Sequence, residues 1–373
     1  MTDLNAFDHH PRTRLIFGPG TLEQLGSLAA GLNGKRVLLV SDPGIVKAGH
    51  AGRAIASLEA AGLAVQLFDQ VHENPSTRDV AECVTAAAAF DTDLIVGLGG
   101  GSSMDTAKGC NFILTNGGRM QDYWGVGKAT KAMLPLIAVP TTSGTGSECQ
   151  SFALISDEET HVKMACGDLK AAAAVAILDP ELTVSQPARV TAVTGIDAIA
   201  HALETAVTKK RNAVSALYSL EAFRQLSSGF ERVLQNPSDL EARSAMLLGA
   251  AFAGTAIENS MLGAAHSCAN PLTAEYGIVH GQAVGLMLPH VIRFNAALPE
   301  IAAIYARYGS TDLPAQVESW LRAAGLSTRL SELGVEAEKI PVLAVSAAKQ
   351  WTAHFNPRTI TEADFAELFT AAL

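Results

Sequence analysis

A carboxylate and three imidazoles lie in the second half of this 373-residue chain at spacings that suit a metal ion. Asp197 and His201 stand four residues apart in Thr194–Glu204, so on a helix both side chains point from one face. His266 and His280 follow further along the chain. One carboxylate with three imidazoles is a donor set for a borderline divalent cation such as Fe²⁺ or Zn²⁺. The spacing therefore suggests a metal site that does chemistry.

A glycine-rich turn in the first half is suited to binding a phosphate. The segment Asp93–Lys108 has an apolar run, three glycines (Gly99, Gly100 and Gly101) and then a helical pattern. Glycines let the backbone approach a pyrophosphate closely, and the free N–H groups of a helix start favour an anion. We expect Ser102 or Ser103 to cap this helix. The spacing is not the standard G-x-G-x-x-G, and a plain strand-to-helix turn is the alternative.

Two further loops support a dinucleotide site. Asp42 ends an apolar run, where a carboxylate accepts hydrogen bonds from a ribose and repels a 2′-phosphate, which favours NAD over NADP. The alternative is an Asp that opens a Pro-Gly turn. A segment of small hydroxyl residues and glycines, Pro140–Glu148, follows another apolar run; its alternative is a polar loop that caps the next helix.

The elements that must position these residues alternate in the first half of the chain. Short apolar runs at 35–41, 64–68, 93–97, 134–139 and 174–178 predict buried parallel strands. Helical patterns lie between them, at 50–61, 76–90 and from Ser102. After Asp179-Pro180 the helical period dominates, with windows at 197–207, 213–234, 240–259, 282–295 and 313–324. We predict an α/β Rossmann-like dinucleotide-binding domain at 1–185 and an all-α metal-binding and catalytic domain at 186–373, with the cofactor in the cleft between them.

Composition excludes some classes of function. Apolar residues make up 48% of the chain and aromatic residues 6%, which is typical of a helix-rich globular protein. The net charge of −10 argues against binding to nucleic acid or to anionic membranes. No segment is long and apolar enough to span a bilayer, and the N-terminus has no signal pattern. An odd number of cysteines without a C-x-x-C pair indicates reduced thiols and a cytoplasmic protein.

Taken together, the motifs resemble the iron-containing (group III) alcohol dehydrogenase family over nearly the whole chain. The residues that carry the resemblance are Arg14–Gly20, Asn74-Pro75, the Gly-Gly-Gly-Ser loop, Pro140–Glu148, Leu178–Leu182, Gly195–His201 and His280-Gly281. Each motif is common by itself, but their combination and order are specific to the family.

The resemblance implies an NAD(P)-dependent alcohol dehydrogenase or aldehyde reductase that acts on a small alcohol or aldehyde. It implies a divalent metal, Fe²⁺ with Zn²⁺ as the alternative, on Asp197, His201, His266 and His280. It implies cofactor contacts at Asp42, Asn74, Gly99, Gly100, Gly101, Ser102, Thr141, Thr142, Thr145, Lys163 and Leu182. It also suggests a homodimer or higher homo-oligomer.

One departure from the family concerns the proton. The family often has a further histidine ten residues before the last ligand, where it lines the active site; this chain has Asn270. Asn270 belongs to the expected catalytic set, but its amide cannot titrate. Gln150 stands where a threonine is common.

Two other enzyme types share features with these motifs. A zinc-dependent glycerol or polyol dehydrogenase has the same fold and ligand spacing. A non-redox NAD-using lyase of the dehydroquinate-synthase type would need a basic cluster in the helical half. The basic residues there, such as Lys209, Lys210, Arg211 and Arg293, are scattered.

Overall fold

The computed structural model describes residues 4–309 and 311–373, and the chain divides into two compact units. The sheet unit comprises His10–Thr142 and Gly146–Gln186. The helical unit comprises Pro187–Leu373 together with residues 4–9 and Ser143–Thr145. The α/β and all-α fold classes expected from the sequence are confirmed.

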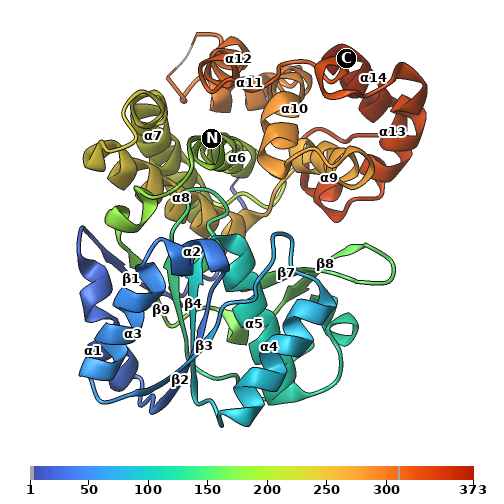
Figure 1. Cartoon of the computed structure of the whole chain (residues 1–373). Helices are drawn as coiled ribbons and strands as arrows, with labels where there is room; N and C mark the ends of the chain where they lie inside the picture. Colours follow the sequence, from blue (N-terminus) through green and yellow to red (C-terminus); the bar gives the residue numbers. More distant parts are fainter. Residues whose placement is uncertain (1–3, 310) are drawn as a thin grey trace. The chain divides into compact units, whose positions relative to one another are not determined.

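A six-stranded parallel sheet forms the centre of the sheet unit, with strand order β1-β9-β6-β4-β2-β3 (Figure 1). Its strands are β1 (Arg14–Phe17), β2 (Arg36–Val40), β3 (Ala64–Phe68), β4 (Leu94–Gly99), β6 (Leu136–Pro140) and β9 (Val175–Leu178). All residues of β4, β6 and β9 are buried, as the continuous apolar runs predict.

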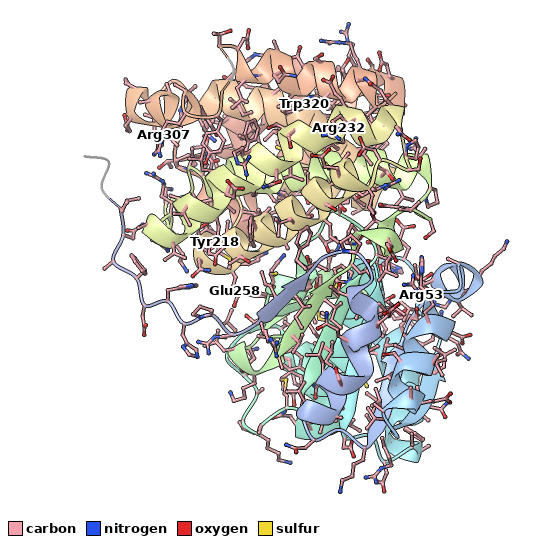
Figure 2. The ribbon with its side chains drawn as sticks, turned by 90° about the vertical axis from the view of Figure 1, so that its left-hand side faces the viewer. Arg53, Tyr218, Arg232, Glu258, Arg307 and Trp320 are labelled. Carbon is pink, nitrogen blue, oxygen red and sulfur yellow. The ribbon has the colours of Figure 1, made fainter. Side chains whose placement is uncertain are left out.

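Helices cover both faces of this sheet (Figure 1). They are α1 (Leu25–Gly31), α2 (Pro43–Lys47), α3 (His50–Ala60), α4 (Thr77–Ala89) and α5 (Gly101–Asn116). Alternate strand residues point to opposite faces, so the sheet has two separate apolar cores. Val37 and Leu39 pack with α1 and α3, whereas Leu38 and Val40 pack with α4 and α5. Arg53 of α3 lies at the surface of this unit (Figure 2). Its guanidinium is 3.4 Å from the carboxylate of Glu181.

A second, three-stranded sheet in the same unit was not expected from the sequence. It has the order β5-β8-β7, from β5 (Gly125–Val126), β8 (Lys163–Gly167) and β7 (Phe152–Ser156). Met164 and Cys166 of β8 are buried in a separate small core with Ala153 and Ile155 of β7. The strand β8 contains Lys, Ala and Gly, which strands do not favour, so a strand was hard to predict there.

The described part of the helical unit contains helices and no strand from Pro187 onward. The helices are α6 (Ala188–Thr205), α7 (Ala213–Gln235), α8 (Leu240–Ser260), α9 (Ala264–Tyr276), α10 (His280–Asn295), α11 (Pro299–Tyr305), α12 (Leu313–Ala323), α13 (Ile340–Ala348) and α14 (Glu362–Ala372). The helix α6 packs against α7, α8 and α10. It is buried around most of its circumference because alanine and glycine let its neighbours approach closely.

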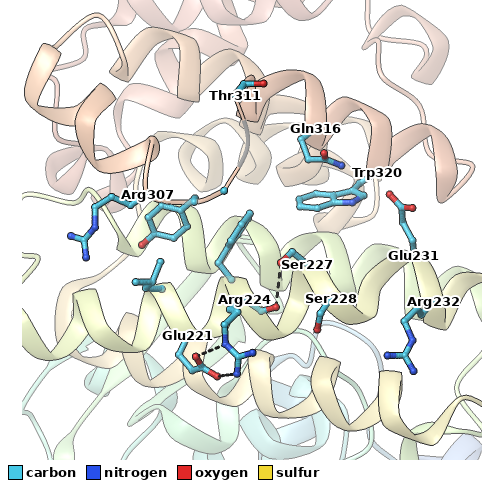
Figure 3. A pocket seen from close by; sticks show the side chains of 14 residues that line it. Glu221, Arg224, Ser227, Ser228, Glu231, Arg232, Arg307, Thr311, Gln316 and Trp320 are labelled. Carbon is cyan, nitrogen blue, oxygen red and sulfur yellow. Dashed lines mark hydrogen bonds and ion pairs between the residues drawn. The ribbon is translucent and has the colours of Figure 1, made fainter.

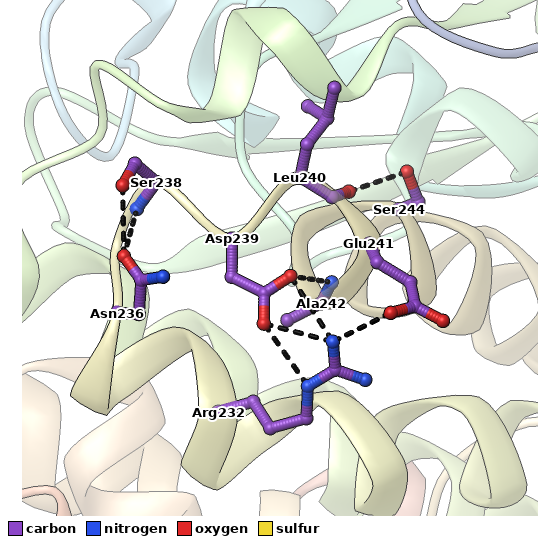
Figure 4. Close-up of polar contacts among 8 residues, drawn as sticks. All are labelled: Arg232, Asn236, Ser238, Asp239, Leu240, Glu241, Ala242 and Ser244. Carbon is purple, nitrogen blue, oxygen red and sulfur yellow. Dashed lines mark hydrogen bonds and ion pairs between the residues drawn. The ribbon is translucent and has the colours of Figure 1, made fainter.

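The α7–α8 hairpin is closed by polar contacts at its turn (Figure 4). Asp239 caps α8 by accepting from the backbone N–H of Ala242, and Arg232 donates to both Asp239 and Glu241. The outer surface of this unit carries Tyr218, Arg232 and Arg307 (Figure 2). The exposed ion pairs of Arg232 with Asp239 and Glu241 orient the turn but contribute little to the free energy of unfolding.

No single helix in the described residues is long and apolar enough to cross a membrane. The helices α8 and α9 meet the length and composition requirement only as a pair that is bent by 105°.

Candidate active site

The helix α6 places Asp197 and His201 on one face, one turn apart, as their spacing predicts. Asp197 Oδ1 lies 3.6 Å from His201 Nε2, and both side chains are less than a tenth exposed. The surrounding residues of α6 are alanine and isoleucine with no exposed surface. The pair is therefore held on a rigid, buried helix.

The helix α9 brings His266 to the same point. Its Nε2 lies 3.5 Å from Asp197 Oδ1, and its ring stacks on that of His201 with 4.9 Å between centroids. The donor atoms of Asp197, His201 and His266 all lie within 4.8 Å of one another. This helix was not expected from the sequence, because Pro271 lies inside it and its apolar pattern is weak.

His280, the first residue of α10, lies beside these three residues. Its ring centroid is 5.4 Å from that of His266. The next residue is a glycine for a steric reason: a Cβ at Gly281 would lie 2.0 Å from the carbonyl oxygen of Val193 on α6. Only glycine lets the start of α10 approach α6 this closely. We call Asp197, His201, His266 and His280 the Asp–His cluster.

The charges of the Asp–His cluster are coupled. Burial favours the protonated form of Asp197, but His201, His266 and His280 outweigh it and lower the pKa of this carboxyl. Burial disfavours the charged form of His266, yet Glu204 and Asp197 raise its pKa to about 9. Burial lowers the pKa of His201, against the opposing effect of Asp197. The carboxylate is thus ionised and buried among groups that stabilise its charge.

Two atoms of the Asp–His cluster fit a bound cation. Asp197 Oδ1 and His266 Nε2 are buried and have no hydrogen-bond partner among the described residues. Leaving such a group unpaired costs about 1–3 kcal/mol. A cation between them would satisfy both atoms, and the donor set suits Fe²⁺ or Zn²⁺. The residues therefore fit the metal that the resemblance implies.

Sequence reasoning missed Glu204, although it lies on the same face of α6. It follows Asp197 by seven residues and His201 by three, which is two turns and one turn of helix. Glu204 Oε2 lies 2.5 Å from His266 Nδ1. The spacing indicated that Glu204 shares a face with Asp197 and His201. Its contact with His266 could not be predicted, because it depends on where α9 packs.

Asn270 lies one turn after His266 on α9, on the same side of the helix. Its Nδ2 donates to Gln350 Oε1 at 2.9 Å, and Gln350 Nε2 donates to the carbonyl of Ser346 at 3.3 Å. These bonds fix the amide orientations and leave Asn270 Oδ1 as an acceptor. The position offers hydrogen bonding but no titrating group.

In the sheet unit, the glycine loop ends β4 and begins α5. Gly99 has φ of 149°, and a Cβ there would lie 2.4 Å from Ser103 Oγ, so only glycine fits. The expected cap at Ser102 or Ser103 is wrong: Gly100 is the N-cap, no side chain caps the helix, and both serines lie in its first turn. The N-cap residue Gly100 has an extended backbone and has no side chain that could accept a hydrogen bond from the helix start. No side-chain oxygen therefore accepts a capping hydrogen bond at this helix start.

The loops after β2, β4 and β6 lie at one edge of the sheet, because these strands are neighbours in a parallel order. Asp42 caps α2 by accepting from Ile45 N at 3.1 Å, as expected for the alternative in which this Asp opens a Pro-Gly turn. It also accepts from Ser103 Oγ at 3.4 Å. The N–H of Thr141 donates to the carbonyl of Gly99 at 2.9 Å. Asp42 and Thr141 thus both lie against the glycine loop.

The other expected cofactor residues differ in exposure. Thr142 lies beside Gly100, with its Cγ2 3.4 Å from where a Cβ would be. Lys163, at the start of β8, and Asn74, which has φ of 53°, are exposed. Thr145 belongs to the short segment that groups with the helical unit. Leu182 is fully buried in the core formed with α1 and α3.

A buried polar network behind the glycine loop was also missed by sequence reasoning. Lys108 has no exposed surface, and its Nζ donates to Ser147 O, Ser147 Oγ and Phe152 O at 2.6–2.9 Å. Ser147 in turn donates to Asp105. Burial raises the pKa of the neighbouring Glu148 to about 7, partly offset by Lys108. This network joins α5 to the loop after β6.

A groove elsewhere in the helical unit contains none of these residues (Figure 3). It measures about 900 Å³, and Phe223, Tyr308 and Trp320 are among its lining residues. At its rim Arg224 is paired with Glu221, as the dashed lines in Figure 3 show. We assign this groove no part in the reaction, because its lining includes no residue of the Asp–His cluster or of the glycine loop.

A parallel α/β sheet with a phosphate-type glycine loop and a helical unit with a buried metal-type cluster define a class. That class is the metal-dependent dehydrogenases that use a nicotinamide dinucleotide.

Comparisons with known proteins agree with this class. Residues 11–180 match the family model described as iron-containing alcohol dehydrogenase, and residues 191–373 match the C-terminal model of the same family. The chain is similar to the NAD-dependent methanol dehydrogenase of Bacillus methanolicus, with 34% identity over 96% of this chain and 97% of that one. It is also similar to the 1,3-propanediol dehydrogenase of Klebsiella pneumoniae, with 32% identity over 98% of each chain.

Solved structures show the same likeness. A crystal structure of 1,3-propanediol oxidoreductase superposes with a TM-score of 0.94 at 32% identity, covering 99% of this chain and 100% of that one. Sulfoacetaldehyde reductase from Bifidobacterium kashiwanohense, solved in complex with NAD⁺, gives 0.91 at 27% identity, covering 99% of each chain.

The chain belongs to the iron-containing alcohol dehydrogenase family. The expectation of a nicotinamide-dependent oxidoreductase acting on CH–OH groups is confirmed, and neither the zinc polyol dehydrogenase nor the lyase alternative is favoured.

Proposed function

We propose that this chain transfers a hydride reversibly between a small alcohol and C4 of the nicotinamide of NAD, with Fe²⁺ held by the Asp–His cluster. The observation that carries the proposal is the pair of buried, unpartnered atoms, Asp197 Oδ1 and His266 Nε2, which converge at 3.5 Å. A divalent ion supplies Lewis-acid chemistry there, because it lowers the pKa of a bound hydroxyl and polarises a carbonyl. Zn²⁺ is the alternative metal.

The protein residues have separate tasks in this proposal. Three neutral imidazoles and one carboxylate would leave the ion with net positive charge. The open N-terminus of α5 and the glycine loop would bind the pyrophosphate. Asp42 at the end of β2 would accept hydrogen bonds from the adenosine ribose, so NAD is favoured over NADP. We place the remaining cofactor contacts at Asn74, Ser102, Thr141, Thr142, Thr145, Lys163 and Leu182.

The proton released from the alcohol needs an acceptor other than Asn270. An amide cannot take it, so we propose that the proton leaves through water or a ribose hydroxyl. Asn270 Oδ1 would then hold that water or the substrate in place by accepting a hydrogen bond.

We also propose a cytoplasmic, homo-oligomeric enzyme. All five cysteines are buried free thiols, which supports a reducing compartment. The oligomeric state is read out by light scattering coupled to gel filtration.

The proposal is tested by cofactor reduction across primary alcohols, diols and hydroxy acids, with elemental analysis of protein purified without added metal. We expect NAD reduction with small alcohols and about one equivalent of iron. His266→Ala and His280→Ala should abolish metal retention and activity together. Full activity after complete removal of metal would refute the Lewis-acid role.

A further inference from the structure

Glu204 makes contacts that link two parts of the helical unit. It is 3% exposed, and each of its oxygens has a separate partner. Oε2 lies 2.5 Å from His266 Nδ1, and Oε1 accepts from the backbone N–H of Ala265 at 2.7 Å. One carboxylate of α6 thus holds both the ring of His266 and the first turn of α9.

This contact determines which nitrogen of His266 faces Asp197. Donation from the ring to the Glu204 carboxylate requires a proton on Nδ1. In the neutral ring that would bind a metal, Nε2 then carries the lone pair, and it is this atom that lies 3.5 Å from Asp197 Oδ1 without a hydrogen-bond partner. Metal-bound imidazoles are oriented in this way by an acceptor on the second nitrogen.

The surrounding backbone leaves space for this carboxylate. A Cβ at Gly263, the N-cap of α9, would lie 3.1 Å from Glu204 Oε1 and 3.3 Å from Asn356 Oδ1. Two residues earlier, Met261 has φ of 72°, in the left-handed region. The turn before α9 therefore has a conformation that lets the carboxylate reach both of its partners.

We infer that Glu204 is a positioning residue for the metal: it fixes the tautomer and the ring orientation of His266, and through them the affinity for the ion. This inference rests on the proposed metal site. It adds a residue that does not touch the ion, the alcohol or the cofactor. Loss of such a partner weakens metal binding by about 10–100-fold.

The test is Glu204→Gln, with Co²⁺ binding to the metal-free protein measured by competition against a chelator. The glutamine Oε1 can still accept from Ala265 N–H, so the start of α9 keeps its bond. Its NH₂ group, however, meets Nδ1 and favours the other tautomer, which puts a proton on Nε2. We expect a Kd for Co²⁺ raised about 10–100-fold, with an altered d–d absorption spectrum.

Ser267→Ala is the matched control. Ser267 lies beside His266 on α9, has no exposed surface, and donates to the carbonyl of Gly263 at 3.1 Å. Its hydroxyl also shares a hydrogen bond with Thr352 Oγ1 at 2.8 Å, so its loss removes two buried hydrogen bonds of the same helix and leaves the four residues of the Asp–His cluster unchanged. We expect its Co²⁺ affinity to stay within about twofold of wild type, well below the loss that a missing ligand partner causes.

The outcomes separate this inference from the proposed function. A wild type that binds no Co²⁺ overturns both, whereas a wild type that binds Co²⁺ and a Glu204→Gln variant with equal affinity overturn only the role of Glu204. If the variant fails to fold, long-range ¹H–¹⁵N spectra of zinc-loaded wild type labelled in histidine decide the matter. A proton on Nδ1 of His266 supports the inference, and a bare Nδ1 overturns it.

Discussion

Single residues show what a helix period predicts and what it leaves open. The Asp197–His201 pair followed from spacing, because both residues lie on one helix. The approach of His266 and His280 to that pair depends on two other helices, and periodicity in one segment does not determine where another packs. Before the structure, only the resemblance to a family grouped His266 and His280 with Asp197 and His201.

Replacing Asn270 with histidine tests the proton path at this scale. The side chain lies one turn from His266, and an imidazole there titrates near neutral pH. We expect Asn270→His to add a titration with a pKa of about 6–7 to the pH profile of turnover. Profiles that coincide for both proteins would remove any role of this position in proton transfer, and Gln350→Ala serves as the control for lost packing.

Glu148 makes a residue-scale prediction about stability. Burial raises its pKa from 4.5 to about 7, so between these pH values the folded state keeps a proton that the unfolded state loses. The free energy of unfolding should therefore fall as pH rises through this window, by at most about 3 kcal/mol.

Denaturant titrations of wild type and Glu148→Gln at pH 5 and pH 8 measure this contribution. The variant cannot ionise, so its stability relative to wild type should rise between the two pH values. A stability difference that is the same at both pH values would contradict the prediction, whatever its sign.

At the scale of elements, the sequence predicted the strands and helices whose hydrophobic pattern is continuous and missed a helix whose pattern is interrupted. Parallel strands such as β4 are unbroken apolar runs, and α7 and α8 are long periodic helices. The helix α9 contains Asn270-Pro271, and proline inside a pattern normally ends a helix. Tertiary packing overrides that local preference here, at the element that carries His266.

Gly281→Ala tests the contact between α10 and α6. The added Cβ would lie 2.0 Å from the carbonyl oxygen of Val193, so α10 must shift and take His280 with it. We expect a loss of about 2–3 kcal/mol in unfolding free energy together with weakened metal binding.

Gly52→Ala is the control for this substitution. Gly52 lies within α3, and a Cβ there meets nothing within 4 Å. The same change should stabilise the protein by about 0.5–1 kcal/mol, because alanine has a lower entropy cost in a helix. Equal effects of the two substitutions would show that the predicted steric contact does not govern stability.

For the whole molecule, metal removal should lower thermal stability through the helical unit. All four residues of the Asp–His cluster belong to that unit. A ligand at 100 times its Kd stabilises the folded state by about 2.7 kcal/mol, so chelation should lower Tm by a few degrees.

Calorimetry with EDTA, followed by restored Fe²⁺ or Zn²⁺, measures this shift. His280→Ala is the control, since its Tm should respond little to chelator. A wild-type Tm that is indifferent to both treatments would be evidence against a resident ion.

The placement of three functional carboxylate and imidazole groups on α6 has a consequence for how the family can diverge. Each residue added to a helix turns everything beyond it by about 100°. An insertion or deletion between Asp197 and Glu204 would therefore rotate at least one of these side chains away from the others and into the packed alanine surface of α6. The helix geometry therefore constrains the length of this segment, whereas a substitution at Asn270 on α9 leaves the three groups of α6 in register.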